Sequence, residues 1–261
     1  MTAVRVFAIG GLISYRALFG FMTPWIFIPA LVVTPIFQIL LFAYIGRTAD
    51  LESDTFYVLG NSLQYAAVPC LFAMTQTIAG ERNQGTLGFI LVSPAGRLSL
   101  FLGRAVPVVA NGFFVSAFAF AVGSALLDVD VPAGSVAPIL LVTAVATFSC
   151  TGLGLVNAGL AFIVRETAVL SNILFGLLLV FTGANVPLDQ MPGWMQTVAG
   201  GLPFTHAIEA ARRLAGGDTL RDVGGLVGAE LLIGAIYVVA GYGLLRALEV
   251  KSRRHATLER A

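Results

Sequence analysis

The sequence predicts an all-α integral membrane protein with six transmembrane helices. Hydrophobic residues make up 57% of the 261 residues and charged residues only 11%, whereas a soluble domain carries about 25% charged residues. Apolar runs long enough to cross the hydrocarbon core recur along the chain, and polar segments separate them. The predicted fold also contains an N-terminal interfacial helix, a short cytoplasmic helix after span two and extracellular re-entrant helices between spans five and six.

The first part of the chain predicts a surface helix followed by two spans. Within residues 1–23, Arg5 and Arg16 flank a stripe of apolar residues at helical spacing. This segment is too charged to cross the membrane, so we expect it to lie along the inner surface. Residues 24–46 and 56–79 form the first two predicted spans, and an acidic loop joins them.

Four further apolar runs complete a single transmembrane domain over residues 1–261. The remaining four spans are predicted at residues 105–127, 135–164, 168–184 and 226–245. A tail at residues 246–261 follows them. Pro107 is expected in the first turn of span three, where its missing N–H costs little.

Polar and small side chains inside these runs predict contacts between helices. Amide side chains can hydrogen-bond across helices within a bilayer, and the runs contain Gln38, Asn61, Gln64, Asn111, Asn157 and Asn172. Small residues four apart, such as Gly224 and Gly228 or Gly154 and Ala158, permit close helix approach. Both cysteines, Cys70 and Cys150, lie within apolar runs and are expected to be packing residues.

The basic residues predict which side of the membrane each loop faces. With six spans, all but four of the 15 lysines and arginines fall on the side of the N-terminus, the exceptions being Arg47, Arg212, Arg213 and Arg221. By the positive-inside rule, both termini and residues 80–104 are cytoplasmic. A miscounted span within residues 185–225 would instead move the tail outside.

The polar segment at residues 80–104 predicts a docking element at the membrane surface. It opens with Glu81 and Arg82, and charges at membrane depth cost about 2.5–3.5 kcal/mol each. Apolar residues at Leu87 and Ile90 fall at helical spacing, and a Ser-Pro pair at residues 93–94 ends the pattern.

A second interruption, residues 185–225, predicts short helices that enter the outer leaflet without crossing it. Pro187, Pro192 and Pro203 divide it into apolar pieces too short to span. Trp194 and Phe204 suit the level of the lipid headgroups.

The residue inventory excludes the common enzyme sites. Lys251 is the only lysine and lies outside any glycine-rich phosphate-binding loop, so ATP hydrolysis would require another polypeptide. His206 and His255 fall on opposite sides of the predicted membrane, and no metalloprotease or serine-hydrolase motif is present. We therefore predict no catalytic, metal-binding or cofactor-binding residue and no nucleic-acid partner, and we interpret His206 as an interfacial polar residue.

Glu230 is the acidic residue nearest to the interior of a predicted span. Because charges within membranes usually pair, we expect it to pair with Arg213 or Arg221, while a proton relay is the alternative interpretation.

Three features resemble the type-2 ABC exporter permeases. The first is the pattern E-R-x-x-G-T-L with S-P downstream, and the second is an M-P-x-W-M motif followed by L-P-F-T-H-A-I-E-A-x-R at residues 202–212. The third is the six-span order behind an interfacial helix. Asn83 stands where many members have a second acidic residue, which leaves partner selectivity open. Residues 9–19 are most similar to the daunorubicin-type drug-exporter group.

The resemblance implies roles for both polar segments. Residues 80–104 would hold a coupling helix that docks into an ATPase subunit, through Glu81, Arg82, Gly85, Thr86, Leu87, Ile90, Ser93 and Pro94. Within residues 185–225, residues 187–217 would form an extracellular gate, or alternatively a structural cap, with Trp194, Leu202, Pro203, Phe204 and Glu209 as its main residues.

The resemblance also implies partners and a location. Two ATPase subunits would bind ATP and Mg²⁺, while this chain would hold no cofactor. A second permease, the same or a related chain, would complete the complex in the bacterial cytoplasmic membrane. The low charge inside the spans favours export of an amphiphilic or lipid-like substrate, such as a drug, an antibiotic or a glycolipid.

Two other functions compete with this interpretation. A secondary multidrug transporter or a channel would need no ATPase partner, but usually keeps an acidic residue at mid-membrane. A membrane scaffold protein would bind a partner without transporting a substrate.

Overall fold

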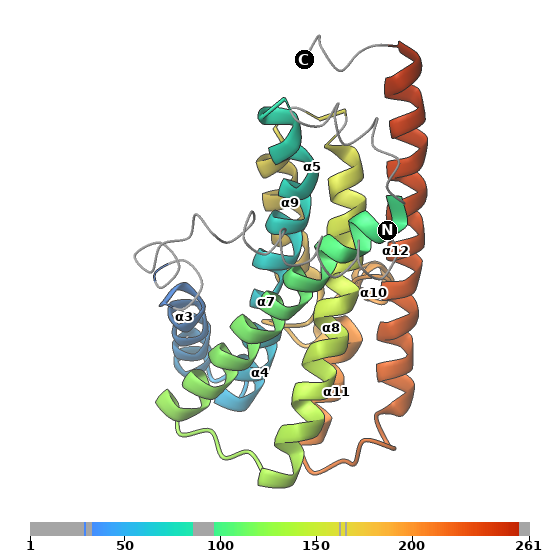
Figure 1. Cartoon of the computed structure of the whole chain (residues 1–261). Coiled ribbons are helices and arrows are strands. Elements are labelled where there is room, and N and C mark those ends of the chain that lie inside the picture. The colour runs from blue at the N-terminus through green and yellow to red at the C-terminus, as the bar shows by residue number, and fades with distance from the viewer. Residues whose placement is uncertain (1–28, 30–32, 86–96, 162, 165, 256–261) are drawn as a thin grey trace.

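The computed structural model describes residues 29, 33–85, 97–161, 163–164 and 166–255, and no strand occurs among them. The described elements are helices packed into one bundle (Figure 1). This confirms the predicted all-α class. The predicted interfacial helix at residues 1–23 and residues 86–96 of the docking segment lie outside the described residues.

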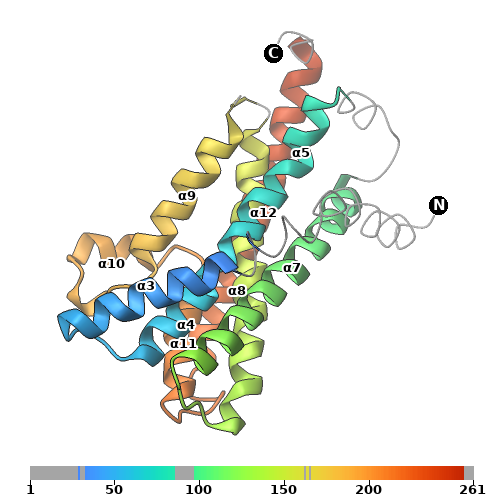
Figure 2. The same cartoon turned by 90° about the vertical axis from the view of Figure 1, so that its left-hand side faces the viewer.

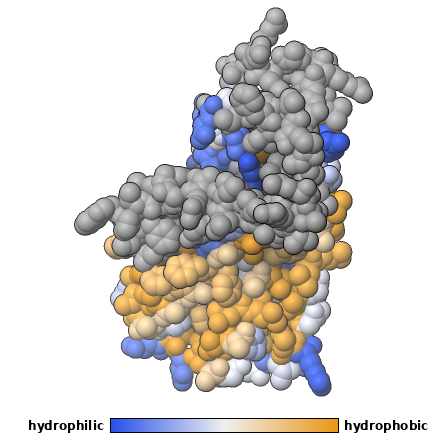
Figure 3. Space-filling model, viewed as in Figure 1, coloured by the Kyte–Doolittle hydropathy of each residue, from blue (hydrophilic) through white to orange (hydrophobic). Residues whose placement is uncertain are grey.

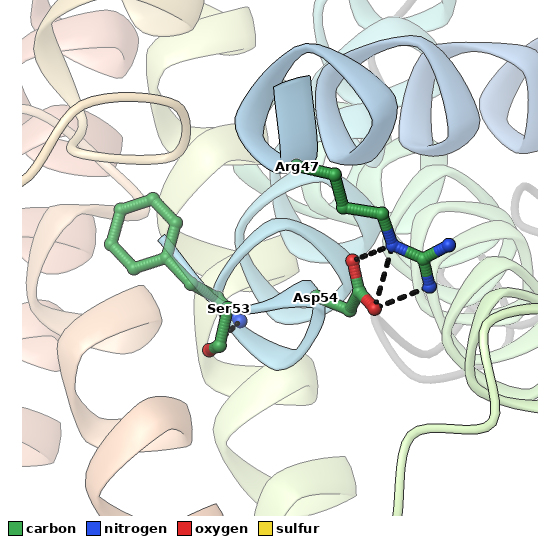
Figure 4. A network of polar contacts seen from close by, with 4 residues as sticks. Arg47, Ser53 and Asp54 are labelled. Atoms are coloured by element: carbon green, nitrogen blue, oxygen red, sulfur yellow. Dashed lines mark hydrogen bonds and ion pairs between the residues drawn. The ribbon is translucent and has the colours of Figure 1, made fainter. Parts of the chain in front are cut away.

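The α3–α4 corner is a tight connection between two helices. Helix α3 (Thr34–Ala49) ends with Asp50 in the left-handed region at φ 50°, and α4 (Asp54–Tyr65) begins after Ser53. The Ser53 hydroxyl accepts a hydrogen bond from the Phe56 amide at 3.3 Å, which satisfies one free N–H of the first turn. The Arg47 guanidinium reaches across the corner to the Asp54 carboxylate (Figure 4).

The second predicted span is a helical rod with a wide turn in its middle. Helix α4 leads through the π-helix η2 (Pro69–Ala73) into α5 (Met74–Asn83). η2 fits between α7 and α8 because both neighbours present glycine to it. A Cβ added at Gly112 of α7 would lie 2.8 Å from Cys70 Sγ, and one at Gly154 of α8 would collide with the Cys70 carbonyl. Both predicted packing cysteines are fully buried.

Three of the described helices are long and apolar enough to cross a membrane. They comprise most of α7 (Arg97–Leu126), all of α8 (Ala133–Leu160) and most of α12 (Gly224–His255). α8 lies in the centre of the bundle and α12 runs along its side (Figures 1 and 2). The sequence therefore belongs to a multi-pass membrane protein, while the six-span count stays a prediction.

Glycines seven residues apart join α8 to α12. A Cβ added at Gly234 would lie 2.8 Å from the Ser149 backbone, and one at Gly241 would lie 2.8 Å from the Val156 amide nitrogen. Gly152 and Gly159 on α8 face α12 in the same way. The backbones of the two helices approach closely only because these positions lack side chains.

The last part of the chain before α12 folds into short helices. Helix α9 (Thr167–Phe181) is apolar but short, and it is followed by η3 (Leu188–Gln190), α10 (Gly193–Ala199) and α11 (Thr205–Ala215). α11 packs between α8, α12 and α4. It is buried in the bundle rather than spread on its surface.

One detail of the sequence prediction is wrong. Pro107 lies inside α7, because that helix begins ten residues earlier, at Arg97. The helix α12 continues into the predicted tail as far as His255.

The outer surface of the bundle is apolar. On the face shown in Figure 3, hydrophobic residues form a continuous belt, with hydrophilic residues at the lower tip. Exposed side chains of α3, α9 and α12 contribute to this surface, among them Phe37, Ile173, Leu232 and Val239. An apolar surface of this kind suits contact with lipid.

Candidate functional site

Two clusters of charged residues lie at different levels of the bundle. We call the first the α5 cluster, which contains Glu81, Arg82 and Arg104. We call the second the α11 cluster, which contains Arg212 and Glu230. Each cluster connects at least three segments, and each adjoins one of the polar interruptions found in the sequence.

In the α5 cluster, an ion pair joins α5 to α7. The Arg104 guanidinium donates to Glu81 Oε1 at 2.8 Å and to the Thr77 carbonyl at 2.6 Å. The side chains of Arg104 and Glu81 are 14% and 26% exposed, so water screens this pair less than it screens a surface pair. Because its two nitrogens bind two different residues of α5, Arg104 fixes the end of α5 against the start of the membrane-embedded part of α7.

Arg82 joins the same end of α5 to α8. Its guanidinium donates to the carbonyls of Ala161 and Val164, at 3.0 and 3.3 Å. Carbonyls at a helix C-terminus lack partners within the helix and carry partial negative charge, so a cation is favourable there. Arg82 therefore satisfies the end of α8 while holding α5 in place.

Of the predicted coupling residues, three are described. Besides Glu81 and Arg82, Gly85 is exposed and has φ 68°, a left-handed conformation that glycine adopts without strain after the end of α5. The other predicted coupling residues lie outside the described residues, namely Thr86, Leu87, Ile90, Ser93 and Pro94. Their contact role stays a prediction.

In the α11 cluster, Glu230 of α12 holds the start of α11. The side chain is fully buried, and its two carboxylate oxygens accept hydrogen bonds from the amides of Phe204, at 2.9 Å, and Ala207, at 3.3 Å. The first amides of a helix have no partners within the helix, and the positive end of the helix dipole favours an anion. The predicted pairing of Glu230 with Arg213 or Arg221 is wrong, because Glu230 forms no ion pair among the described residues and Arg213 binds Asp218 at 2.8 Å.

Phe204 is a core residue, which corrects the prediction that it lies at the headgroup level. Its side chain is fully buried, and its backbone has φ 74°, a conformation that is costly for a residue with a side chain. The bond from its amide to Glu230 stabilises this conformation. Trp194, by contrast, is 64% exposed and contacts Phe181 edge to face, as expected for an interfacial tryptophan.

Arg212 connects α11 to two other segments. Its guanidinium donates to the carbonyls of Gly183 at 2.8 Å, Ala184 at 3.1 Å and Phe56 at 3.2 Å. The group also lies 3.4 Å from the centroid of the Phe56 ring, where the electron-rich face attracts a cation. Arg212 thus holds the turn after α9 and the first turn of α4 against α11.

The other predicted gate residues surround this cluster. Pro203 is buried beside Phe204, Leu202 is partly buried against the core, and Glu209 lies partly exposed on α11. His206 lies close to the Gly200 carbonyl, with its Nε2 at 3.2 Å. Among the described residues, no group of histidine, cysteine, aspartate or glutamate side chains could hold a metal ion.

Amide side chains link helices at two further places, as predicted. Gln38 of α3 donates to Asn61 and Gln64 of α4, and Asn61 donates to Asn185 after α9. On the other side of the bundle, Asn157 of α8 donates to Thr75 at 2.7 Å and to Ser171 at 2.8 Å. The prediction is wrong for Asn172, whose amide binds a carbonyl of its own helix.

Sequence reasoning missed several of these connections. Arg104 was assigned no partner, and the glycine contacts between α8 and α12 follow a spacing of seven. Of the pairs predicted at a spacing of four, Gly154 does lie at a close contact, with η2. Nothing lies within 4 Å of a Cβ added at Gly224 or Gly228. Matched spacings of seven in both Gly152/Gly159 and Gly234/Gly241 are the signal that would have identified the contact.

Comparisons with known proteins agree with the membrane fold. The sequence profile described as ABC-2 type transporter matches residues 10–214. The "Probable multidrug ABC transporter permease YbhR" of Escherichia coli (strain K12) is 27% identical over 188 residues, which cover 68% of this chain and 50% of that protein. "Nodulation protein J" of Rhizobium leguminosarum bv. trifolii is 36% identical over 116 residues, or 42% of this chain and 40% of that protein.

These matches assign a family. The chain spans about half the length of the first of these relatives. The family profile covers residues 10–214 of 261, which is well over half of the chain and includes both charged clusters except Glu230. The chain belongs to the ABC-2 type transporter family of membrane permeases, whose membrane domain has no ATPase site of its own.

Proposed function

We propose that this chain is the membrane-spanning subunit of an ATP-driven exporter, with ATP hydrolysed by a separate subunit. The observation that carries the proposal is the α5 cluster. Glu81 and Arg82 fix the end of α5 to α7 and α8, directly before residues 86–96. A force applied to that segment by an ATPase would therefore act on three helices together.

In this proposal, the cytoplasmic contact with the ATPase is made by residues beyond α5. Thr86, Leu87 and Ile90 form the contact face, while Glu81 and Arg82 position it through the bundle. Two ATPase subunits bind ATP and Mg²⁺, and a second permease, the same or a related chain, completes the path. Both termini face the cytoplasm, as the positive-inside rule suggests.

The gate segment, residues 187–217, is proposed to close the opposite side. Its helix α11 is packed against α8, α12 and α4, so opening that side requires α11 to move relative to at least one of them. Trp194 is exposed where it can anchor α10 at the lipid interface.

The proposed substrate is amphiphilic or lipid-like. The two relatives are named as a probable multidrug permease and a nodulation protein, and these two names indicate no common substrate. Few charges lie within the described helices that could cross the membrane, and the one buried carboxylate there, that of Glu230, is already bonded by backbone amides. This arrangement favours a substrate with a large apolar part.

The first test is purification of the tagged chain from its own membranes in a mild detergent, with mass spectrometry of the bound proteins. We expect a soluble subunit with a phosphate-binding lysine loop. Reconstitution of both proteins in liposomes should then give ATP-dependent export of a fluorescent amphiphile.

Variants of the α5 cluster sharpen this test. Glu81→Arg should reduce ATP-dependent export at least tenfold, and combination with Arg104→Glu should restore part of it, because the ion pair is re-formed in reverse while the Thr77 carbonyl loses its donor. Transport driven by a proton gradient in the absence of any ATPase would contradict the proposal and support a secondary transporter.

A further inference from the structure

Helix α11 contacts two groups of segments, although α8 of the first group also packs against η2 and α5, which continue the rod that begins with α4. The first group consists of α8, α11 and α12, joined by the glycine contacts and by the bonds from Glu230 to the start of α11. Ile208 and Leu214 of α11 are almost fully buried in the core. The second group consists of α4 and the turn at residues 183–184, which follows α9.

Arg212 is the charged side chain that crosses from the first group to the second. All three of its carbonyl acceptors belong to the second group, and they come from two segments more than 120 residues apart in the sequence. Gly60 of α4 makes this approach possible. A Cβ added there would lie 2.8 Å from Arg212 Nη2 and would collide with the Ala184 carbonyl.

The contact made by Arg212 is incomplete. Its Nε atom is buried and has no hydrogen-bond partner, and its acceptors are uncharged carbonyls. Charge-assisted bonds to carboxylates are stronger than bonds from the same cation to neutral acceptors. The negative charges of Glu209 and Glu52 are the two that attract Arg212 most strongly, although neither forms a described ion pair with it.

We propose that Arg212 is a releasable latch between the two groups of helices. In this structure the guanidinium binds the carbonyls of Phe56, Gly183 and Ala184, which holds the gate segment closed. When the groups separate, the guanidinium leaves these carbonyls and pairs with Glu209, which lies three residues earlier on α11. The role of the latch in export rests on the proposed function, whereas the release of Arg212 can be tested on this chain alone.

The latch can be tested without any ATPase. Spin labels on cysteines introduced at the exposed positions Leu51 and Leu220 report the distance between the α3–α4 loop and the α11–α12 loop in liposomes. Cys70 and Cys150 are fully buried and stay unlabelled. The unaltered chain should give one distance population, and Arg212→Met should add a second, longer population that holds at least half of the molecules.

Neighbouring variants separate a latch from a purely structural role. Arg213→Met, which removes only a surface contact one residue away, should leave the single population unchanged. Arg212→Lys keeps the charge but loses the forked geometry, so it should give a smaller second population. A single unchanged population in both Arg212 variants would overturn the latch, and so would mere broadening without a second peak.

Gly60→Ala provides an independent route to the released state, because the added methyl group occupies the docking place of Arg212. It should produce the same longer population. Adding Glu209→Gln should then shrink that population at least threefold, because the released guanidinium loses its carboxylate. If Glu209→Gln has no effect, Glu209 is not the alternate partner. If the distances behave as expected but no ATPase is ever recovered, the export function fails while the latch stands.

Discussion

The α5 cluster and the α11 cluster use the same residue types in different ways. In the α5 cluster, Glu81 and Arg104 bind each other and remain partly exposed, and Arg104 also donates to the Thr77 carbonyl. In the α11 cluster, Glu230 is fully buried and Arg212 is partly buried, and the bonds described for them go to backbone groups instead of to each other. An ion pair between side chains can be partly restored by exchanging its two members, whereas a side chain bonded only to backbone can be replaced only by one of the same shape and charge.

The largest effect is expected at the carboxylate of Glu230. Glu230→Ala should lower the free energy of unfolding by about 3–5 kcal/mol, because two amides lose their acceptor and a cavity forms. Glu230→Gln keeps one acceptor oxygen and should cost about half as much. Thermal unfolding in detergent micelles measures both variants. Equal stability of Glu230→Ala and the unaltered chain would show that the carboxylate does not hold α11.

A smaller effect is expected at the glycine contacts between α8 and α12, the helices that support both clusters. Gly234→Ala should cost about 1–3 kcal/mol, because its Cβ would press against the backbone of Ser149. Gly228→Ala on the same helix meets nothing within 4 Å and should stabilise the protein by about 0.5–1 kcal/mol through helix propensity. The two Tm shifts should have opposite signs. If they share a sign, close contact between the helices does not depend on glycine.

Charge reversal tests the difference between the clusters directly. Glu81→Arg or Arg104→Glu alone should cost about 1–2 kcal/mol, and the double reversal should recover part of that loss, because the ion pair forms again while the Thr77 carbonyl loses its donor. The corresponding double reversal of Glu230 and Arg212 should be at least as damaging as either single change. Recovery in the α11 cluster would mean that these two charges interact with each other after all.

The smallest effect is expected for the surface pair of Arg213 and Asp218, whose side chains are 45% and 39% exposed. Arg213→Met should change the free energy of unfolding by no more than about 0.5 kcal/mol. A Tm shift as large as that of Arg212→Met would remove the distinction between a buried cation on backbone acceptors and an exposed ion pair.

The sequence predicted the features that depend on local composition. Long apolar runs correctly indicated α7, α8 and α12. Trp194 and Phe204 were both predicted at the headgroup level from residue type alone, and the structure exposes Trp194 but buries Phe204. Its backbone amide is bound by a carboxylate 26 positions later in the sequence, a contact that local composition does not reveal.

Features that depend on backbone partners could not be predicted. Glu230 was expected to form an ion pair with an arginine, because sequence patterns reveal charged side chains but not the free amides at the start of a folded helix. The glycine contacts were equally hard to recognise, because the chain contains 29 glycines and most spacings occur by chance. Of the candidate site, sequence reasoning identified both segments but not the atoms that hold them.

The π-helix η2 sets the rotational phase between the two halves of the rod formed by α4 and α5. A π turn contains about one residue more than an α turn, and one residue corresponds to a rotation of about 100° around the helix axis. With this offset, Asn61 faces α3 and Glu81 faces α7. Deleting one residue from Pro69–Ala73 would turn α5 by about 100° relative to α4. The angular relation between the two clusters is therefore encoded in one backbone turn near the middle of the rod.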